Sequence, residues 1–80
     1  MNDTQIREHI ESLVAEENQL LEHGENGHLT NDDRERLDQI SVRLDQYWDL
    51  LRQRRARRDA GQDPSVAHMR SSDVVEHYRQ

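Results

Sequence analysis

Two segments of the 80-residue chain carry apolar residues at spacings of mostly three and four. In the first segment these residues are Ile6, Ile10, Leu13, Val14, Leu20 and Leu21. In the second segment they are Leu37, Ile40, Leu44, Tyr47 and Leu51. This spacing is typical of one face of an α-helix, since a half-buried strand would instead alternate apolar and polar residues. The sequence therefore predicts two helices, one over residues 4–23 and one over residues 31–60.

A turn between the two predicted helices is indicated by glycines and by a capping sequence. Gly24 and Gly27 both disfavour a helix, and they predict a turn over residues 24–30. Thr30 followed by Asp33 resembles a capping box with Asp in place of Glu, so the second helix is expected to begin directly after Thr30.

The second helix is expected to end where glycine and proline follow it in the sequence. Gly61 suits the left-handed position just after a helix, and Pro64 prevents the helix from resuming. Residues 61–80 form a C-terminal tail that could hold a short helix over residues 73–79. The sequence leaves open whether this tail docks on the second helix, docks on another chain or is a loose terminus.

The two apolar stripes match each other when the chain folds back on itself. Opposite residues, such as Leu13 and Leu44 or Ile10 and Tyr47, then have numbers that add to 57. We therefore predict an all-α fold, a coiled-coil-like antiparallel two-helix hairpin over residues 1–60 that carries the short C-terminal tail.

A second apolar strip lies beside the first one on both predicted helices. It consists of Val14, Leu21, Tyr47 and Trp48. One hairpin cannot cover both strips, and Leu, Ile, Val and Phe together make up only 16 of the 80 residues, which is little for a chain that folds alone. Two hairpins packed as a four-helix bundle would cover both strips. We therefore expect a homodimer whose surface contains these four residues.

Charge is distributed unevenly along this acidic chain, whose formal net charge is −6. Residues 1–51 contain 13 acidic residues and 4 arginines, whereas residues 52–58 read RQRRARR and contain five arginines. Arginine forms planar, two-point contacts with carboxylates and phosphates. The predicted partner-binding residues therefore lie at the end of the second helix, and they are Trp48, Arg52, Arg54, Arg55 and Arg58.

Three interpretations of this arginine block are open. The arginines could be ordinary surface charges that complement the carboxyl end of the helix dipole. They could instead form a socket for carboxylates, either from the tail (Asp63, Asp73 and Glu76) or from Asp3 and Glu8 of a neighbouring chain. They could also contact the phosphates of a nucleic acid, although the acidic remainder of the chain would repel a polyanion.

Common enzyme and cofactor patterns are missing from the sequence. It has no Ser-His-Asp order, no glycine-rich phosphate loop and no paired-acid cleft, so we expect neither an enzyme nor a bound cofactor. Residues 22–33 have the length of a calcium-binding loop with Gly27 at its sixth position, but Gly24 at the third position offers no side-chain oxygen. A plain turn without a metal is the better interpretation, and weak calcium binding is the alternative.

The expected setting and function follow from these observations. The chain has no cysteine, and no long apolar run or signal peptide is recognisable, so we expect a cytoplasmic protein without membrane contact. The function that we expect is a non-enzymatic protein–protein interaction or assembly module, which binds an acidic protein through the arginine-rich end of the second helix. The main alternative is a nucleic-acid-associated accessory protein that uses the same arginines for phosphate.

The most distinctive stretch is LDQYWDLLRQRRARRDAGQDP, residues 44–64. In this stretch, above all at residues 48–56 and at the Gly-x-Asp-Pro sequence that begins with Gly61, the chain resembles a family of small actinobacterial proteins of unknown function. The resemblance implies a helical hairpin and a bacterial cytoplasmic setting. It implies no catalytic or binding residues, because the family has no established activity.

Overall fold

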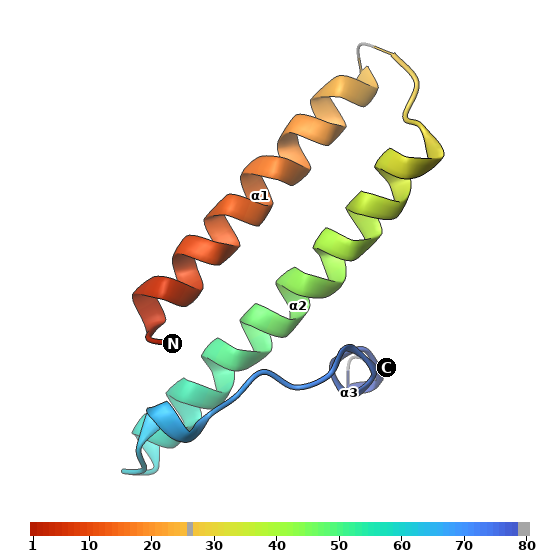
Figure 1. Cartoon of the computed structure of the whole chain (residues 1–80). Helices are drawn as coiled ribbons and strands as arrows, with labels where there is room; N and C mark the ends of the chain where they lie inside the picture. Colours follow the sequence, from red (N-terminus) through yellow and green to blue (C-terminus); the bar gives the residue numbers. More distant parts are fainter. Residues whose placement is uncertain (26, 79–80) are drawn as a thin grey trace.

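The computed structural model describes residues 1–25 and 27–78. Along the chain the elements are α1 (Asp3–Glu25), α2 (Asn31–Asp59), the 3-10 turn η1 (Pro64–Val66) and α3 (Ser72–Tyr78). α1 and α2 lie side by side and antiparallel, so the N-terminus lies beside the C-terminal half of α2 (Figure 1). The tail then returns along α2, and α3 crosses it (Figure 1). The prediction of an all-α hairpin is confirmed, and a short C-terminal helix accompanies it.

α1 extends slightly beyond the predicted range of residues 4–23 at both ends. At its start, the Asn2 side chain accepts a hydrogen bond from the Gln5 amide at 2.8 Å, and the Gln5 side chain accepts one from the Asn2 amide at 2.9 Å. At its end, Gly24 lies inside the helix and does not terminate it. A Cβ atom on Gly24 would lie 2.8 Å from Leu29 Cγ, so this glycine allows the returning chain to approach the helix closely.

Both ends of α2 are closed by local hydrogen bonds. Thr30 Oγ1 accepts from the Asp33 amide at 3.0 Å, and Asp33 Oδ2 accepts from the Thr30 amide at 3.1 Å, which completes the capping box. After the helix, Gly61 has a φ of +72°, a left-handed conformation that favours glycine. The amides of Gly61 and of the next residue donate to the carbonyl oxygens of Arg58 and Arg57, so a Schellman motif ends the helix.

The main core lies in the half of the hairpin that is remote from the turn. Its buried members are Ile6, Ile10, Tyr47 and Leu50, and the residues packed against them are Leu13, Leu44, Leu51, Ala67 and Met69. Ile10 and Tyr47, which face each other in the register derived from the sequence, are thus in one cluster. Tyr47 is only 7% exposed, so it belongs to the core of the single hairpin and is separated from the exposed strip in which the sequence analysis placed it.

The C-terminal tail docks on α2 through polar side chains of that helix. Three of these side chains donate to tail carbonyl oxygens: Gln46 to Arg70 at 3.2 Å, Gln53 to His68 at 2.9 Å and Arg54 to Pro64 at 3.1 Å. α3 lies on the side of α2 that faces away from α1 (Figure 1), and its Val75 is 2% exposed. Of the three alternatives for the tail that the sequence left open, docking on α2 is therefore the one that the structure has. Residue 79, the expected end of the tail helix, lies outside the described residues.

Replacing Val75 with aspartate is expected to release α3 while the hairpin stays folded. Burial of a valine side chain contributes about 1.5–3 kcal/mol, so hydrogen exchange of the α3 amides should accelerate at least ~10-fold. The matched control is Val74→Asp, because Val74 is 50% exposed on the same helix. Unchanged protection of α3 in the Val75 variant would contradict the docking of α3 through this side chain.

Candidate interaction surface

Asp3 at the start of α1 binds two arginines near the end of α2. Its Oδ1 accepts from Arg54 Nε at 2.5 Å and from Arg58 Nη1 at 3.2 Å, and its Oδ2 accepts from Arg58 Nη2 at 2.8 Å. The residue numbers 3 and 54 also add to 57, so this contact continues the register of the hairpin. α1 therefore covers part of the arginine block, because the Asn2 cap starts the helix opposite Arg54.

Arg54 is only 8% exposed, and its guanidinium group is held on two sides. Pro64 O accepts a hydrogen bond from Arg54 Nη1 at 3.1 Å, so the tail closes over the side chain that Asp3 already binds. Hydrogen bonds from Arg58 and Arg54 lower the pKa of Asp3 from 3.8 to about 2. A carboxylate socket thus exists for these two arginines within one chain, and it leaves Arg54 inaccessible to a partner.

Other arginines of the block are accessible beside Trp48. A groove is formed by Asp3 and Arg7 of α1 together with Trp48, Leu51, Arg52, Arg55 and Arg58 of α2. Trp48 is 49% exposed, and the Arg52 side chain is 60% exposed with a long ion pair of 3.9 Å to Asp49. Arg55 is exposed as well. We call the surface made by Arg7, Trp48, Arg52 and Arg55 the Trp48 face.

The described part of the tail, through residue 78, docks on other sides of α2 and leaves the Trp48 face uncovered. At about 100° per residue, the three α2 side chains that bind tail carbonyls lie about 120–160° around the helix from Trp48. By the same count Arg52 and Arg55 lie within about 40° of Trp48. Among the described residues, α3 contacts α2 and does not contact α1. A face that spans both helices is thus left open to solvent.

Two exposed apolar residues of α1 extend the Trp48 face toward the turn. Val14 is 37% exposed and Leu21 is 47% exposed. Arg7, Val14 and Leu21 are seven residues apart, and a seven-residue step turns a side chain by only about 20° around a helix. The structure therefore brings together three of the four residues assigned to the dimer surface, Val14, Leu21 and Trp48. Arg7 was not predicted to belong to this surface, although its seven-residue spacing from Val14 places both side chains on one face of α1.

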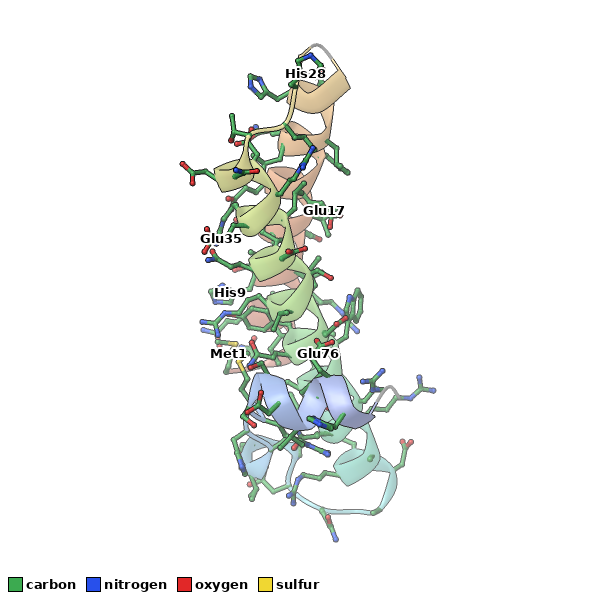
Figure 2. All side chains as sticks on the ribbon, turned by 90° about the vertical axis from the view of Figure 1, so that its right-hand side faces the viewer. Met1, His9, Glu17, His28, Glu35 and Glu76 are labelled. Carbon is green, nitrogen blue, oxygen red and sulfur yellow. The ribbon has the colours of Figure 1, made fainter. Side chains whose placement is uncertain are left out.

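The opposite side of the hairpin is occupied within the single chain. His9 stacks on Tyr47 with ring centroids 5.2 Å apart, and Arg43 lies over the same ring at 5.9 Å from its centroid. Met69 of the tail reaches this side, where its Sδ is 3.9 Å from Arg43 Nη1. Figure 2 shows His9 at one edge of the hairpin and Glu17 at the other. The two edges therefore differ, and the tail reaches the edge that carries His9 through Met69.

An ion pair joins the two helices nearer to the turn. Arg36 Nε donates to Glu16 Oε2 at 2.6 Å, and Arg36 Nη2 donates to Glu16 Oε1 at 2.8 Å. These hydrogen bonds lower the pKa of Glu16. Both side chains are about two-fifths exposed, so solvent screens the pair and its contribution to stability is small.

Sequence comparison supplies the family. A family model described as "Protein of unknown function (DUF2630)" matches residues 2–80. The chain belongs to this family. Its relatives include the uncharacterized proteins Rv0898c of Mycobacterium tuberculosis (strain H37Rv) and Mb0922c of Mycobacterium bovis, each 47% identical over 79 residues, which is 95% of this chain and 88% of each relative. The expected resemblance to small actinobacterial proteins of unknown function is thus confirmed. No solved structure has a significant match to the chain.

The turn of this DUF2630 chain is shorter than the calcium-binding loop considered for residues 22–33. α1 continues through Glu25 and α2 begins at Asn31, so most of that segment is helical, and Asn26 lies outside the described residues. Within the described residues, no three His, Asp or Glu side chains form a group that could hold a metal ion. Among the same residues, no helix has the length and apolarity needed to cross a membrane.

Proposed function

We propose that this DUF2630 protein is a non-enzymatic interaction module whose Trp48 face binds an acidic protein surface. The observation that carries the proposal is the division of the arginine block. Asp3 accepts hydrogen bonds from Arg54 and Arg58 within the chain, whereas Arg52 and Arg55 stay exposed beside Trp48 without a contact to Asp3. Arginine and tryptophan are enriched among the residues that dominate the binding energy of protein interfaces.

The chemistry of the Trp48 face favours carboxylates as ligands. Arg7, Arg52 and Arg55 line a groove in which the single carboxylate, Asp3, is already engaged by other arginines. A carboxylate from a partner would form charge-assisted, two-point hydrogen bonds with these guanidinium groups. An apolar side chain of the partner would cover the exposed part of the Trp48 ring. These two features describe an acidic protein segment with at least one apolar residue.

Binding of a nucleic acid through the same arginines is the second candidate. The observation in its favour is the group of exposed guanidinium groups, which also pair with phosphates. The net charge of −6 opposes it, because the rest of the chain would repel a polyanion. Such binding would weaken steeply as the salt concentration rises, and it would be sensitive to nuclease.

The proposal predicts that Arg52→Gln/Arg55→Gln prevents capture of an acidic protein on the immobilised chain. Capture would use a lysate of the source organism, with and without nuclease, followed by mass spectrometry of the retained proteins. Loss of both guanidinium groups should lower retention at least ~10-fold, since truncation of one charged hot-spot contact costs more than about 1 kcal/mol. The acidic protein should still be retained by the unmodified chain after nuclease treatment.

The matched control is Arg43→Gln/Arg57→Gln, which removes the same charge from the far side of α2 by the helical count. This control should retain the partner, whereas Trp48→Ala should lose it while the hairpin stays folded, because Trp48 is half exposed. Equal losses in the two double variants would contradict the proposal. Retained material that disappears with nuclease would favour the nucleic-acid alternative.

A further inference from the structure

The two ends of the hairpin carry opposite charge. Residues 16–38, which surround the turn, contain eight acidic residues and two arginines, a net charge of −6. The other end, residues 1–7 together with 52–63, contains six arginines and three aspartates, a net charge of +3. The chain is 50 Å in its longest dimension, and these two groups lie at opposite ends of the hairpin (Figure 1). The hairpin is therefore a charge dipole along its length.

Together with Val14 and Leu21, the Trp48 face runs from one charged end toward the other, and Val14 lies near the middle of this longer surface. At about 1.5 Å per residue, Arg7 lies about 10 Å from Val14 toward the N-terminus, and Leu21 lies about 10 Å from it toward the turn. Val14, Leu21 and Trp48 are each between one-third and one-half exposed, so the middle of this face is apolar and solvated. Apolar residues in the middle and charge at both ends are typical of an interface with a charged rim.

Exposed acidic residues flank the half of this face near the turn. Glu22 and Asp38 are exposed, and by the helical count they lie about 80° from Val14 and Trp48 around their respective helices, at the margin of the face. The exposed Arg34 lies about 40° from Trp48 in the same half. Carboxylates that complement the arginine-rich half therefore lie along the margin of the same face of the same chain. A carboxylate-bearing surface with apolar residues beside it is the kind of partner that the Trp48 face would bind.

We propose that the acidic partner of the Trp48 face is a second copy of this chain, packed antiparallel so that the turn of each copy lies on the arginine-rich end of the other. This inference rests on the proposed function and names the partner of that surface. Val14 of one copy would then pack on Val14 of the other. Counted from this centre at about 1.5 Å per residue, Arg7 reaches the level of Glu22, and Trp48 reaches the level of Asp38.

The orientation follows from charge. A parallel arrangement would place the two acidic turns together and the two arginine-rich ends together, and both contacts would be repulsive. The antiparallel arrangement has a two-fold axis through its centre, so each attractive contact between an arginine-rich end and a turn occurs twice and the assembly closes as a dimer. The resulting four-helix arrangement would cover the exposed apolar residues that the single hairpin leaves in water.

A charge-swap experiment tests the proposal. The unmodified chain should sediment with twice its mass of 9.5 kDa at micromolar concentration. Arg7→Glu/Arg52→Glu should be monomeric, as should Glu22→Arg/Asp38→Arg, with dimer dissociation constants raised at least tenfold. An equimolar mixture of the two variants should form a heterodimer, because antiparallel packing then places opposite charges together at both ends.

A matched variant and a cross-linking experiment complete the test. Arg43→Glu/Arg57→Glu makes the same charge change on the far side of α2 and should stay dimeric. Because the chain has no cysteine, Val14→Cys can be introduced alone, and it should form an intermolecular disulfide rapidly at the two-fold axis. Leu21→Cys should form one much more slowly, since its two copies would lie about 21 Å apart along the helices.

Each contrary outcome overturns a defined part of the inference. A monomeric unmodified chain would exclude the second copy as the partner, and a dimer that survives Arg7→Glu/Arg52→Glu would exclude this face. Failure of the mixture to form heterodimers would exclude the antiparallel orientation. None of these results would affect capture of a different acidic protein that depends on Arg52 and Arg55, so failure of this inference is distinguishable from failure of the proposed function.

Discussion

Asp3→Asn is expected to lower the free energy of unfolding by about 2–3 kcal/mol, measured by chemical denaturation at neutral pH. The substitution keeps the shape of the side chain and removes its charge. Arg54 is only 8% exposed, and its guanidinium group would then be buried without the Asp3 carboxylate. It would keep the neutral Pro64 carbonyl as a hydrogen-bond acceptor. Loss of one partner of a fully buried ion pair costs about 3–5 kcal/mol, and the smaller value expected here reflects an Asp3 side chain that is 24% exposed.

Two comparisons isolate the contact of Asp3 with Arg54. Asp59→Asn removes an equal charge from an exposed position at the end of α2, and it should change stability by less than about 0.5 kcal/mol. In a double-mutant cycle, Arg54→Gln should make the Asp3 substitution much less costly, because the two side chains act as a unit. Equal effects of Asp3→Asn and Asp59→Asn would contradict a specific contribution of the contact between Asp3 and Arg54.

The Asp3 contact should also make stability depend on pH in the acid range. The pKa of Asp3 is about 2 in the folded chain, through hydrogen bonds from Arg58 and Arg54, against an ordinary value of 3.8. Because the folded pKa is depressed, this contribution is present in full above about pH 4 and is lost as the pH falls toward 2. The stability difference between the unmodified chain and Asp3→Asn should shrink over this window, and a constant difference would refute the assignment.

Ile6→Ala is expected to have the largest effect on stability, a loss of about 3 kcal/mol, measured by urea denaturation at a fixed protein concentration. Ile6 is fully buried, and it belongs to the core cluster with Ile10, Tyr47 and Leu50. Removal of its outer carbons would leave a cavity, because α1, α2 and the tail all contribute atoms to this cluster and cannot easily collapse together.

The control for Ile6→Ala is Val66→Ala in η1. Val66 is 58% exposed, so its truncation should change the free energy of unfolding by less than about 0.5 kcal/mol. Comparable losses in the two variants would mean that the α1–α2 contact around Ile6 contributes little to folding. A fixed concentration is needed because dimerisation would couple stability to the amount of protein.

The helices and their register were predictable from short-range patterns. The apolar spacing of three and four identified both helices, and the register that places Ile10 opposite Tyr47 follows from matching the two stripes. Thr30 and Asp33 marked the start of α2, and Gly61 marked its end, because a cap involves residues only a few positions apart. Gly24 was misleading as a sign of the end of α1. A glycine stands there because the Leu29 side chain packs too close for a Cβ atom, and the helix continues through it.

The candidate site was predictable only in outline. The arginine block and Trp48 were recognisable as unusual, but nothing in the sequence separated Arg54 from the other arginines of the block. Starting α1 at residue 4 removed Asp3 from the helix, and the carboxylate that binds Arg54 was then sought in the tail or in another chain. Arg7 was not assigned to the site at all, because its neighbour Trp48 lies on the other helix.

The sequence by itself therefore determined two helices, the turn between them and the ends of α2, because these depend on the periodicity and capping of neighbouring residues. The tertiary structure alone decided which of the arginines and aromatic residues near the end of α2 are exposed to solvent. Burial of Arg54 needs Asp3 from α1 and Pro64 from the tail at once, and exposure of Trp48 depends on the tail docking on other sides of α2. These contacts join residues up to 51 positions apart, and no local pattern encodes which of several similar arginines a distant carboxylate will bind.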